Sequence, residues 1–255
     1  MALQPSWEQL RATWAELGAK DPLWAVVTWD EKRRGKWQPR EFFQTGERDV
    51  ARYHDLFKRV TDCPAEFDHI LDFGCGVGRL SLAWSRRARQ VTGVDISPGM
   101  IAKGREFAKS APNVDLRLNE SRDLRCFEDG RFDLVFSHIC LQHVPWELTD
   151  GYLREFARVC RSGGWVAFQL PSRPLRTLSS LAAVRKRIVD CLPFGLNRAY
   201  RNWRRGCPVI FDMYFVPPEN VIRAANHAGL PEIHREPDQS AGESIESFIY
   251  IFGKP

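Results

Sequence analysis

The chain has 255 residues, 44% of them hydrophobic, and its 37 basic and 32 acidic residues leave a net charge of only +5. This length is enough to bury one good core, and an α/β domain of this size commonly stays undivided. The seven cysteines are odd in number and include no C-x-x-C pair, which argues against a disulfide framework or a zinc site. No apolar run approaches the ~20 residues of a membrane span, and no leader pattern opens the chain. A soluble, cytoplasmic protein without a metal site is therefore expected.

The first 65 residues predict helices around an aromatic segment. Residues 6–9, Ser-Trp-Glu-Gln, have the form of a capping box, and apolar residues follow at helical spacing up to Gly18. The stretch 21–43 is rich in tryptophan, arginine and lysine. Apolar residues between Val50 and Val60 then mark another helix.

Residues 70–80, Ile-Leu-Asp-Phe-Gly-Cys-Gly-Val-Gly-Arg-Leu, predict a buried strand, a tight glycine turn and the start of a helix. Gly74 and Gly76 lack a Cβ where the chain turns sharply and where a ligand can approach the backbone. The turn is expected to form a cradle of backbone N–H groups at a helix N-terminus. Cys75, between the two glycines, is expected to be a small packed residue rather than a redox group.

A second strand over residues 90–95 ends in Asp95, which lies 21 positions after Gly74 (95 − 74). In a doubly wound sheet, an acid at this place can bind both hydroxyl groups of a ribose. A dinucleotide fold has the spacing G-x-G-x-x-G, but Arg79 occupies the position of its third glycine. The sequence therefore disfavours a pyrophosphate site.

Together these motifs resemble those of the Rossmann-like class I S-adenosylmethionine-dependent methyltransferases, in the small-molecule branch that includes quinone and sugar methyltransferases. The resemblance covers roughly residues 66–171. Beyond the glycine loop it rests on Asp-Ile-Ser-Pro-Gly-Met at 95–100, Glu-Ser-Arg-Asp-Leu at 120–124, Phe-Asp-Leu-Val-Phe-Ser at 132–137, Leu-Gln-His-Val at 141–144, and a helix, turn and double glycine at 153–164. It implies an α/β fold with a doubly wound, seven-stranded, mostly parallel sheet, a reversed C-terminal strand, and S-adenosylmethionine as the cofactor.

The resemblance also implies a set of cofactor-binding residues: Asp72, Gly74, Gly76, Gly78, Asp95, Ile96, Met100, Glu120, Ser121 and Ser137. Glu120 replaces the usual aspartate. Its carboxylate is expected to accept the adenine amino group while the Ser121 N–H donates to a ring nitrogen; the alternative is a solvated loop acid.

Two histidines flank the end of the fourth strand, on the side where the methyl group is expected to point. His143 is a candidate general base, with a helix-start or core role as the alternative. His138 is expected to lend its backbone carbonyl to the cofactor's amino group, with its side chain facing the acceptor.

The remaining elements follow by alternation of strands and helices. Ser97 and Pro98 predict a capped helix start. Third and fifth strands are expected over 114–118 and 165–170, the fifth ending at Pro171. A helix opens at 217–219, and Ile233 and the run 248–252 supply a final hairpin, with 248–252 as an inner strand.

Between 171 and 206 the chain carries nine basic residues and one acid, so that this stretch has a charge of +8 and the remainder −3. Apolar residues from Leu175 to Leu192 recur at intervals of three or four residues and predict an amphipathic helix with a basic face. This face could cap an anionic substrate, lie on anionic lipid or nucleic acid, or simply be solvated. Charge alone does not choose among these.

The predicted organisation is a single domain in four parts: an N-terminal helical lid (1–65), the cofactor-binding core (66–171), a basic substrate-cap insertion (172–212) and a C-terminal helix and hairpin (213–255). In this family the segment before the glycine loop commonly covers the cofactor. An aromatic lid could shield a sulfonium and grip an apolar substrate, whereas tryptophans that fill the core would not.

The predicted function is in-line transfer of the methyl group of S-adenosylmethionine to a small-molecule acceptor, anionic or apolar, by an oxygen, nitrogen, carbon or sulfur nucleophile. One alternative is an RNA or other nucleic-acid methyltransferase that uses the basic insertion, although Ser-His-Ile-Cys stands at 137–140 in place of an N-P-P-Y motif. Another is an inactive cofactor-binding partner protein. The acceptor and the oligomeric state cannot be predicted from these patterns.

Overall fold

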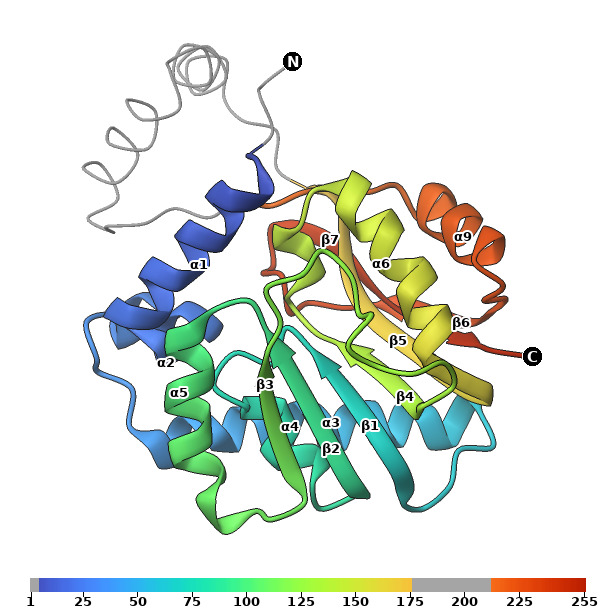
Figure 1. Ribbon diagram of the computed structural model, residues 1–255. Coiled ribbons are helices and arrows are strands. Elements are labelled where there is room, and N and C mark those ends of the chain that lie inside the picture. The colour runs from blue at the N-terminus through green and yellow to red at the C-terminus, as the bar shows by residue number, and fades with distance from the viewer. Residues whose placement is uncertain (1–4, 176–211) are drawn as a thin grey trace, which may run out of the picture.

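The computed structural model describes residues 5–175 and 212–255. Its centre is a seven-stranded sheet in the order β3-β2-β1-β4-β5-β7-β6, with helices on both faces (Figure 1). The strands are β1 (Phe67–Phe73), β2 (Ala88–Asp95), β3 (Val114–Leu118), β4 (Phe132–Ser137), β5 (Cys160–Pro174), β6 (Glu232–Pro237) and β7 (Ile245–Gly253).

Parallel pairing runs through β3, β2, β1, β4 and β5, whereas β7 is antiparallel to both of its neighbours. This confirms the doubly wound sheet with one reversed strand. The run Phe248–Phe252 lies in β7 between β5 and β6, as expected for an inner strand. The helices are α1 (Trp7–Lys20), α2 (Pro22–Val26), α3 (Pro39–Val60), α4 (Arg79–Trp84), α5 (Pro98–Phe107), α6 (Trp146–Val159) and α9 (Pro218–His227), with short 3₁₀ turns at Asp30–Lys32, Ala108–Ser110 and Leu141–His143.

The core lies in two layers, one on each face of the sheet. One layer packs α3 and α4 against β1, β2 and β4, around buried aromatic side chains such as Trp84 and Phe136. The other packs α6 and α9 against the opposite face, around Phe156, Phe168 and Tyr250. Because the sheet is covered on both sides, the central strand β4 is buried throughout, whereas the edge strand β3 alternates apolar and charged residues.

Helix α1 begins at the predicted capping box. The Ser6 side chain accepts from the Gln9 N–H at 3.3 Å, and the Ser6 N–H donates to Gln9 Oε1 at 2.7 Å. The helix does not end near Gly18 but continues to Lys20. Gly18 is needed for packing instead, because a Cβ there would collide with the Ser97 hydroxyl at the start of α5.

Two other boundaries also differ from the prediction. Helix α3 begins at Pro39, eleven residues before Val50 (50 − 39), so part of the aromatic segment belongs to it. Strand β5 does not end at Pro171 but runs to Pro174, with an irregularity between Pro171 and Arg173. β4 pairs with β5 only as far as Phe168, so beyond that point β5 has a neighbour on one side and tolerates proline.

The amphipathic helix predicted over 175–192 and most of the basic insertion at 172–212 lie outside the described residues. Of the helices that the structure describes, none is long and apolar enough to cross a membrane. The helix starting at Pro218 and the Ser97–Pro98 start of α5 are confirmed.

Candidate active site

The glycine loop joins β1 to α4 at the carboxyl edge of the sheet. Gly74, Gly76 and Gly78 have φ values of 75°, 55° and 79°, a region that other residues rarely adopt. A Cβ on Gly74 would collide with Cys140 Sγ, and one on Gly76 would lie 2.6 Å from Val26 Cγ2. The glycines are therefore required both by the turn and by the side chains that close against it.

The loop does not present the expected cradle of open N–H groups. The N–H groups of Gly74 and Cys75 donate to Val94 O at 2.8 and 3.0 Å, and the Gly78 N–H donates to Cys75 O at 2.9 Å. The fold itself uses these donors to set the loop against the end of β2. What the loop offers a ligand is mainly a surface without side chains.

Asp95, at the end of β2, is held ready to bind hydroxyl groups. Its two carboxylate oxygens accept from the backbone N–H groups of Gly76 at 2.9 Å and Ser97 at 2.8 Å. Each oxygen can accept further hydrogen bonds, so the pair fits the two hydroxyls of a ribose. Burial raises the pKa of Asp95, although the backbone donors oppose that shift.

Asp72, near the end of β1, is more deeply buried than Asp95. Ser81 donates its hydroxyl to Asp72 Oδ2 at 2.6 Å. Burial raises the pKa of Asp72 to about 6, against the effects of Ser81 and the nearby Arg79, while the charge of Asp95 adds to the rise.

A cavity of about 240 Å³ opens over the glycine loop and the ends of β2 and β4. Its other walls come from α1, residues 25–29, η3 (Leu141–His143) and the turn before it, and residues 213 and 240–241. Trp7, Trp14 and Trp29 contribute to the lining, whereas Trp24 and Trp37 belong to a buried cluster beside it. The N-terminal aromatic residues are thus divided between cavity wall and core.

The cavity brings together eight of the twelve predicted site residues: Asp72, Gly74, Gly76, Asp95, Ile96, Met100, His138 and His143. The other four are not part of its lining. Gly78 caps α4, and Ser137 donates its hydroxyl to Phe73 O at 3.0 Å. Glu120 forms an ion pair with Arg11, and the Ser121 N–H donates to the Asn119 side chain at 3.2 Å.

Helix α1 is fastened across the cavity by the loop that follows β3. Arg11 pairs with Glu120, and Arg122 donates to Glu8 at 3.1 Å while its guanidinium lies 5.9 Å from the centroid of the Trp7 ring. In Figure 1, α1 projects beyond the edge of the sheet at which the loops after β1 and β2 lie. These contacts hold the aromatic side chains of α1 over the cavity.

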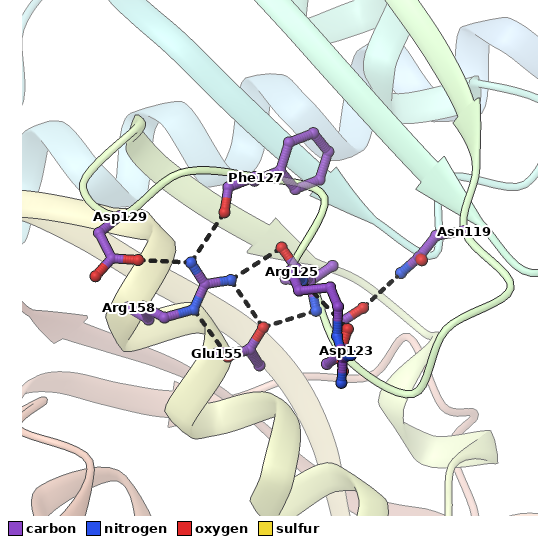
Figure 2. A network of polar contacts seen from close by, with 8 residues as sticks. Asn119, Asp123, Arg125, Phe127, Asp129, Glu155 and Arg158 are labelled. Carbon is purple, nitrogen blue, oxygen red and sulfur yellow. Dashed lines mark hydrogen bonds and ion pairs between the residues drawn. The ribbon is translucent and has the colours of Figure 1, made fainter.

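The loop between β3 and β4 is anchored on α6 by Arg158 and Glu155 (Figure 2). The Arg158 guanidinium donates to the carbonyl oxygens of Leu124 and Phe127, both at 2.9 Å, and pairs with Asp129 at 2.7 Å. Glu155 accepts from Arg158 at 2.9 Å and from the Leu124 N–H at 2.7 Å. One ion pair therefore fixes several backbone groups of this loop.

Asn119 connects that anchored loop to the cavity. Its side-chain amide donates to Asp123 O at 2.9 Å, as Figure 2 shows, and its backbone N–H donates to Asp95 O at 2.9 Å. Asn119 itself lines the cavity. The anchor on α6 therefore helps to place a cavity residue next to Asp95.

His143 lies in η3 and is neutral. Its Nδ1 lies 2.8 Å from Asp212 O, and because a carbonyl only accepts, Nδ1 carries the proton. Nε2 is then an acceptor, and the Gln142 amide nitrogen lies 3.0 Å from it. Burial lowers the pKa of His143 to about 4, which agrees with this tautomer.

His138 lies directly after β4 and is equally buried. Its Nδ1 is 2.6 Å from the Tyr53 hydroxyl, and its Nε2 is 3.8 Å from Asp49 Oδ2. Burial lowers the pKa of His138, with Asp49 acting in the opposite direction. Both ring nitrogens of His138 thus face protein groups, and the expectation that its side chain faces the acceptor stays a prediction.

Several cavity residues were not identified from the sequence. Gln142 stood within a recognised motif and Asn119 directly before one, neither with a chemical reason to single it out, and Arg79 was noted only as a missing glycine. Arg79 lines the cavity and donates to Asp49 at 2.6 Å, which ties α4 to α3. Met213 and residues 240–241 line the cavity because the fold brings distant parts of the chain together, and no local sequence pattern indicates them.

Residues 70–164 match the family model described as "Methyltransferase domain". Trans-aconitate 2-methyltransferase of Streptomyces avermitilis is 28% identical over 172 residues, 61% of either chain. Ubiquinone biosynthesis O-methyltransferase of Chromobacterium violaceum is 28% identical over 162 residues, 63% of either chain. The match thus spans about three fifths of the length of these curated relatives.

Among solved structures, magnesium protoporphyrin IX methyltransferase from Synechocystis, with bound SAH, is similar in fold. Its TM-score is 0.63 at 16% identity, over 96% of this chain and 98% of that chain. This likeness extends the agreement from the matched segment to the complete sheet. Residues 70–164 are therefore similar to a methyltransferase domain, and the whole sheet has the fold of this methyltransferase.

Proposed function

We propose that this protein transfers the methyl group of S-adenosylmethionine to a small-molecule acceptor bound in the same cavity. The observation that carries the proposal is that one cavity joins a glycine loop and the half-buried Asp95 carboxylate to a neutral, buried His143. The first two suit an adenosine group, and the third suits a nucleophile that must lose a proton.

The residues present fit the cofactor. Asp95 has acceptor capacity left for a ribose, Gly74 and Gly76 leave the backbone uncovered, and Ile96 and Met100 supply apolar lining beside them. When bound, the cofactor supplies a methyl group on a positively charged sulfonium. Gly78 and Ser137 would act by holding the loop and the end of β1 in place.

The acceptor side of the cavity favours an apolar or aromatic carbon skeleton. Trp14, Tyr152 and Met213 line it, and the Trp14 ring lies 5.4 Å from that of His143. Aromatic faces also attract cations, so they suit a site that receives a sulfonium. By closing over the cavity, α1 would exclude water from the reacting groups.

We assign the proton transfer to His143. Where the nucleophile of the acceptor is a hydroxyl oxygen or an amine nitrogen, X, its X–H bond would break as the bond from X to the methyl carbon forms. The proton passes to His143 Nε2 after the Gln142 amide moves aside, and the Nδ1–H to Asp212 O bond stabilises the resulting imidazolium. The electron pair of the broken S–CH₃ bond stays on sulfur.

The relatives named above support a small molecule as the acceptor rather than a nucleic acid, since one is named for trans-aconitate and the other for ubiquinone biosynthesis. We also propose a cytoplasmic location, which suits the five described cysteines, all of them free. The four-part division of the chain and the cap role of residues 172–212 remain part of this proposal.

The first test is calorimetric titration of S-adenosylmethionine into the wild type and into Asp95→Asn. Loss of a charge-assisted hydrogen bond predicts about a tenfold or larger increase in Kd. Asp115→Asn is the matched control, because Asp115 lies on β3 in a half-exposed pair with Arg117, outside the cavity lining. Its Kd should stay within about twofold of the wild type.

The second test follows a labelled methyl group from S-adenosylmethionine into two probes, trans-aconitate and catechol. Transfer to either probe supports the enzyme. Binding without transfer to these or a wider panel of small molecules favours the inactive partner protein, and salt-sensitive binding of RNA favours the nucleic-acid alternative. Absence of S-adenosylmethionine binding by the wild type contradicts the proposal.

A further inference from the structure

Ile139 has a strained backbone next to the proposed methyl-transfer site. Its φ is 49°, and among the described residues only one other non-glycine residue, Arg34, has a positive φ. A β-branched residue is especially unfavourable there, because its Cβ approaches the following carbonyl oxygen. A conformation of this kind persists only where its surroundings impose it.

The neighbours of Ile139 impose this conformation from both sides. Ser137 donates to Phe73 O at 3.0 Å, and the His138 ring is bound to the Tyr53 hydroxyl at 2.6 Å. On the other side, Cys140 Sγ occupies the place that a side chain on Gly74 would need. The turn is thereby fixed against the end of β1 and the glycine loop.

The strained residue faces the cavity. Ile139 lines it together with His138 and Cys140, and it is only half-buried, although β4 directly before it is buried throughout. The fold thus places an apolar, branched residue in the wall of the cavity that Gly74 also lines, where the methionine end of the cofactor would lie. A packing role alone does not call for a strained residue that remains half-exposed.

We propose that Ile139 is a positioning residue for the methyl group: the strained turn places its side chain against the sulfonium end of S-adenosylmethionine and so limits the direction in which the methyl group points. This inference rests on the proposed function. Contact with Ile139 therefore favours binding of S-adenosylmethionine over S-adenosylhomocysteine, which lacks the methyl group.

The test compares Ile139→Gly with Ile139→Ala. Both variants remove the branched side chain, but only glycine removes the strain. In an ordinary backbone conformation alanine is the more stable of the two, whereas here the glycine variant should melt about 2–4 °C above the alanine variant. In both variants the Kd for S-adenosylmethionine should rise about three- to fivefold more than that for S-adenosylhomocysteine, the effect of about one lost apolar contact of methylene size.

Arg34 provides the matched control. It has a φ of 62°, is exposed, and does not line the cavity. Arg34→Gly should likewise be more stable than Arg34→Ala, but neither should alter the ratio of the two dissociation constants. A general loosening of the fold would change both constants in parallel, so the ratio separates positioning from stability.

Two results overturn the inference while leaving the proposed function intact. One is equal stability of Ile139→Ala and Ile139→Gly, which would mean that the backbone at this position is not strained. The other is an unchanged ratio of dissociation constants in both Ile139 variants. If the wild type binds neither S-adenosylmethionine nor S-adenosylhomocysteine, the proposed function and this inference fail together.

Discussion

Arg11 on α1 forms an ion pair with Glu120, the residue that was expected to bind the adenine amino group. Both side chains are partly exposed, at 37% and 49%, and Glu120 is not part of the cavity lining. The carboxylate therefore fastens the N-terminal helix across the site. The expected adenine contact remains a prediction, and the two roles of Glu120 lead to different results on substitution.

We predict that Arg11→Gln and Glu120→Gln weaken binding of S-adenosylmethionine to a similar, small extent. An exposed ion pair stabilises by about 0–1 kcal/mol, so the Kd should rise by less than about fivefold in either variant. The difference from the wild type should shrink as salt is raised from about 0.05 M to about 0.5 M. Calorimetric titration at the two salt concentrations measures both effects.

The adenine-binding role predicts an asymmetric result for the same two variants. Glu120→Gln would then lose more than about tenfold in affinity, while Arg11→Gln would bind as well as the wild type or better, because the carboxylate would be released. Such a result would restore the adenine role that the sequence suggested.

The parts of this site that the sequence predicted depend on interactions between near neighbours in the chain. The glycine loop, the strand ending in Asp95 and the Ser97 cap each occupy a few consecutive residues, and their backbone requirements leave a recognisable pattern. The parallel strands were predicted from the alternation of strands and helices, and the seven-stranded sheet with a reversed strand from the family resemblance. The positions of these local elements were therefore predicted correctly.

The parts that the sequence did not predict depend on residues far apart in the chain. Arg11 and Glu120 are separated by 109 positions, and Tyr53 and His138 by 85, so no local pattern indicates either pair. Similarly, the strain at Ile139 arises because its neighbours are held by other elements. Local propensity would have placed an ordinary extended or helical isoleucine there.

For His143 we predict a loss of turnover with little loss of cofactor binding. His143→Gln keeps a polar side chain of similar reach but cannot take up a proton, so kcat should fall by about 10²-fold or more, while the Kd for S-adenosylmethionine stays within about twofold. Because the pKa of His143 lies at about 4, the wild-type rate should show no loss from this group between pH 8 and pH 5. The rates are measured with whichever acceptor probe the wild type methylates.

The control for His143 is His227→Gln, because His227 is exposed at the end of α9 and lies outside the cavity lining. It should have wild-type kcat and affinity. Turnover by His143→Gln at the wild-type rate would show that the acceptor needs no base at this position, as for a nucleophile that is already deprotonated.

For Arg158 we predict a loss of stability that extends to the cofactor site. Arg158→Gln deprives the carbonyl oxygens of Leu124 and Phe127 of their donor and leaves Glu155 without its ion pair. The free energy of unfolding should fall by about 2–3 kcal/mol, as for other hydrogen bonds to charged groups. Urea unfolding gives this value, and titration should show weaker binding of S-adenosylmethionine, because the loop carries Asn119.

The matched control is Arg154→Gln on the same helix. Arg154 pairs with Asp150 on the surface and is 62% exposed, so its loss should change stability by less than about 0.5 kcal/mol. Equal effects of the two substitutions would mean that the network in Figure 2 does not anchor the loop.

For Asp72 we predict a stability effect that depends on pH. Burial raises its pKa from 3.8 to about 6, so the folded state disfavours the ionised form. The folded state therefore binds more protons than the unfolded state between these two values, and this group makes the protein less stable as pH rises through them. This loss of stability is complete above about pH 6 and absent below about pH 3.8. A buried neutral histidine has the opposite effect, because it makes a protein more stable as pH rises.

Asp72→Asn keeps an oxygen that can accept from Ser81 but carries no charge. Relative to the wild type, it should gain stability at pH 8 over pH 4.5 by about 2 kcal/mol, because about 1.5 of the roughly two pKa units of the shift lie above pH 4.5. Asp68→Asn on the same strand is the control, since Asp68 is 75% exposed and its substitution removes one carboxylate at the surface. Urea unfolding of the three proteins at both pH values measures the difference. A gain for Asp72→Asn that is equal at the two values would mean that Asp72 is ionised in the folded protein throughout this range, and that hydrogen-bond donors compensate its burial.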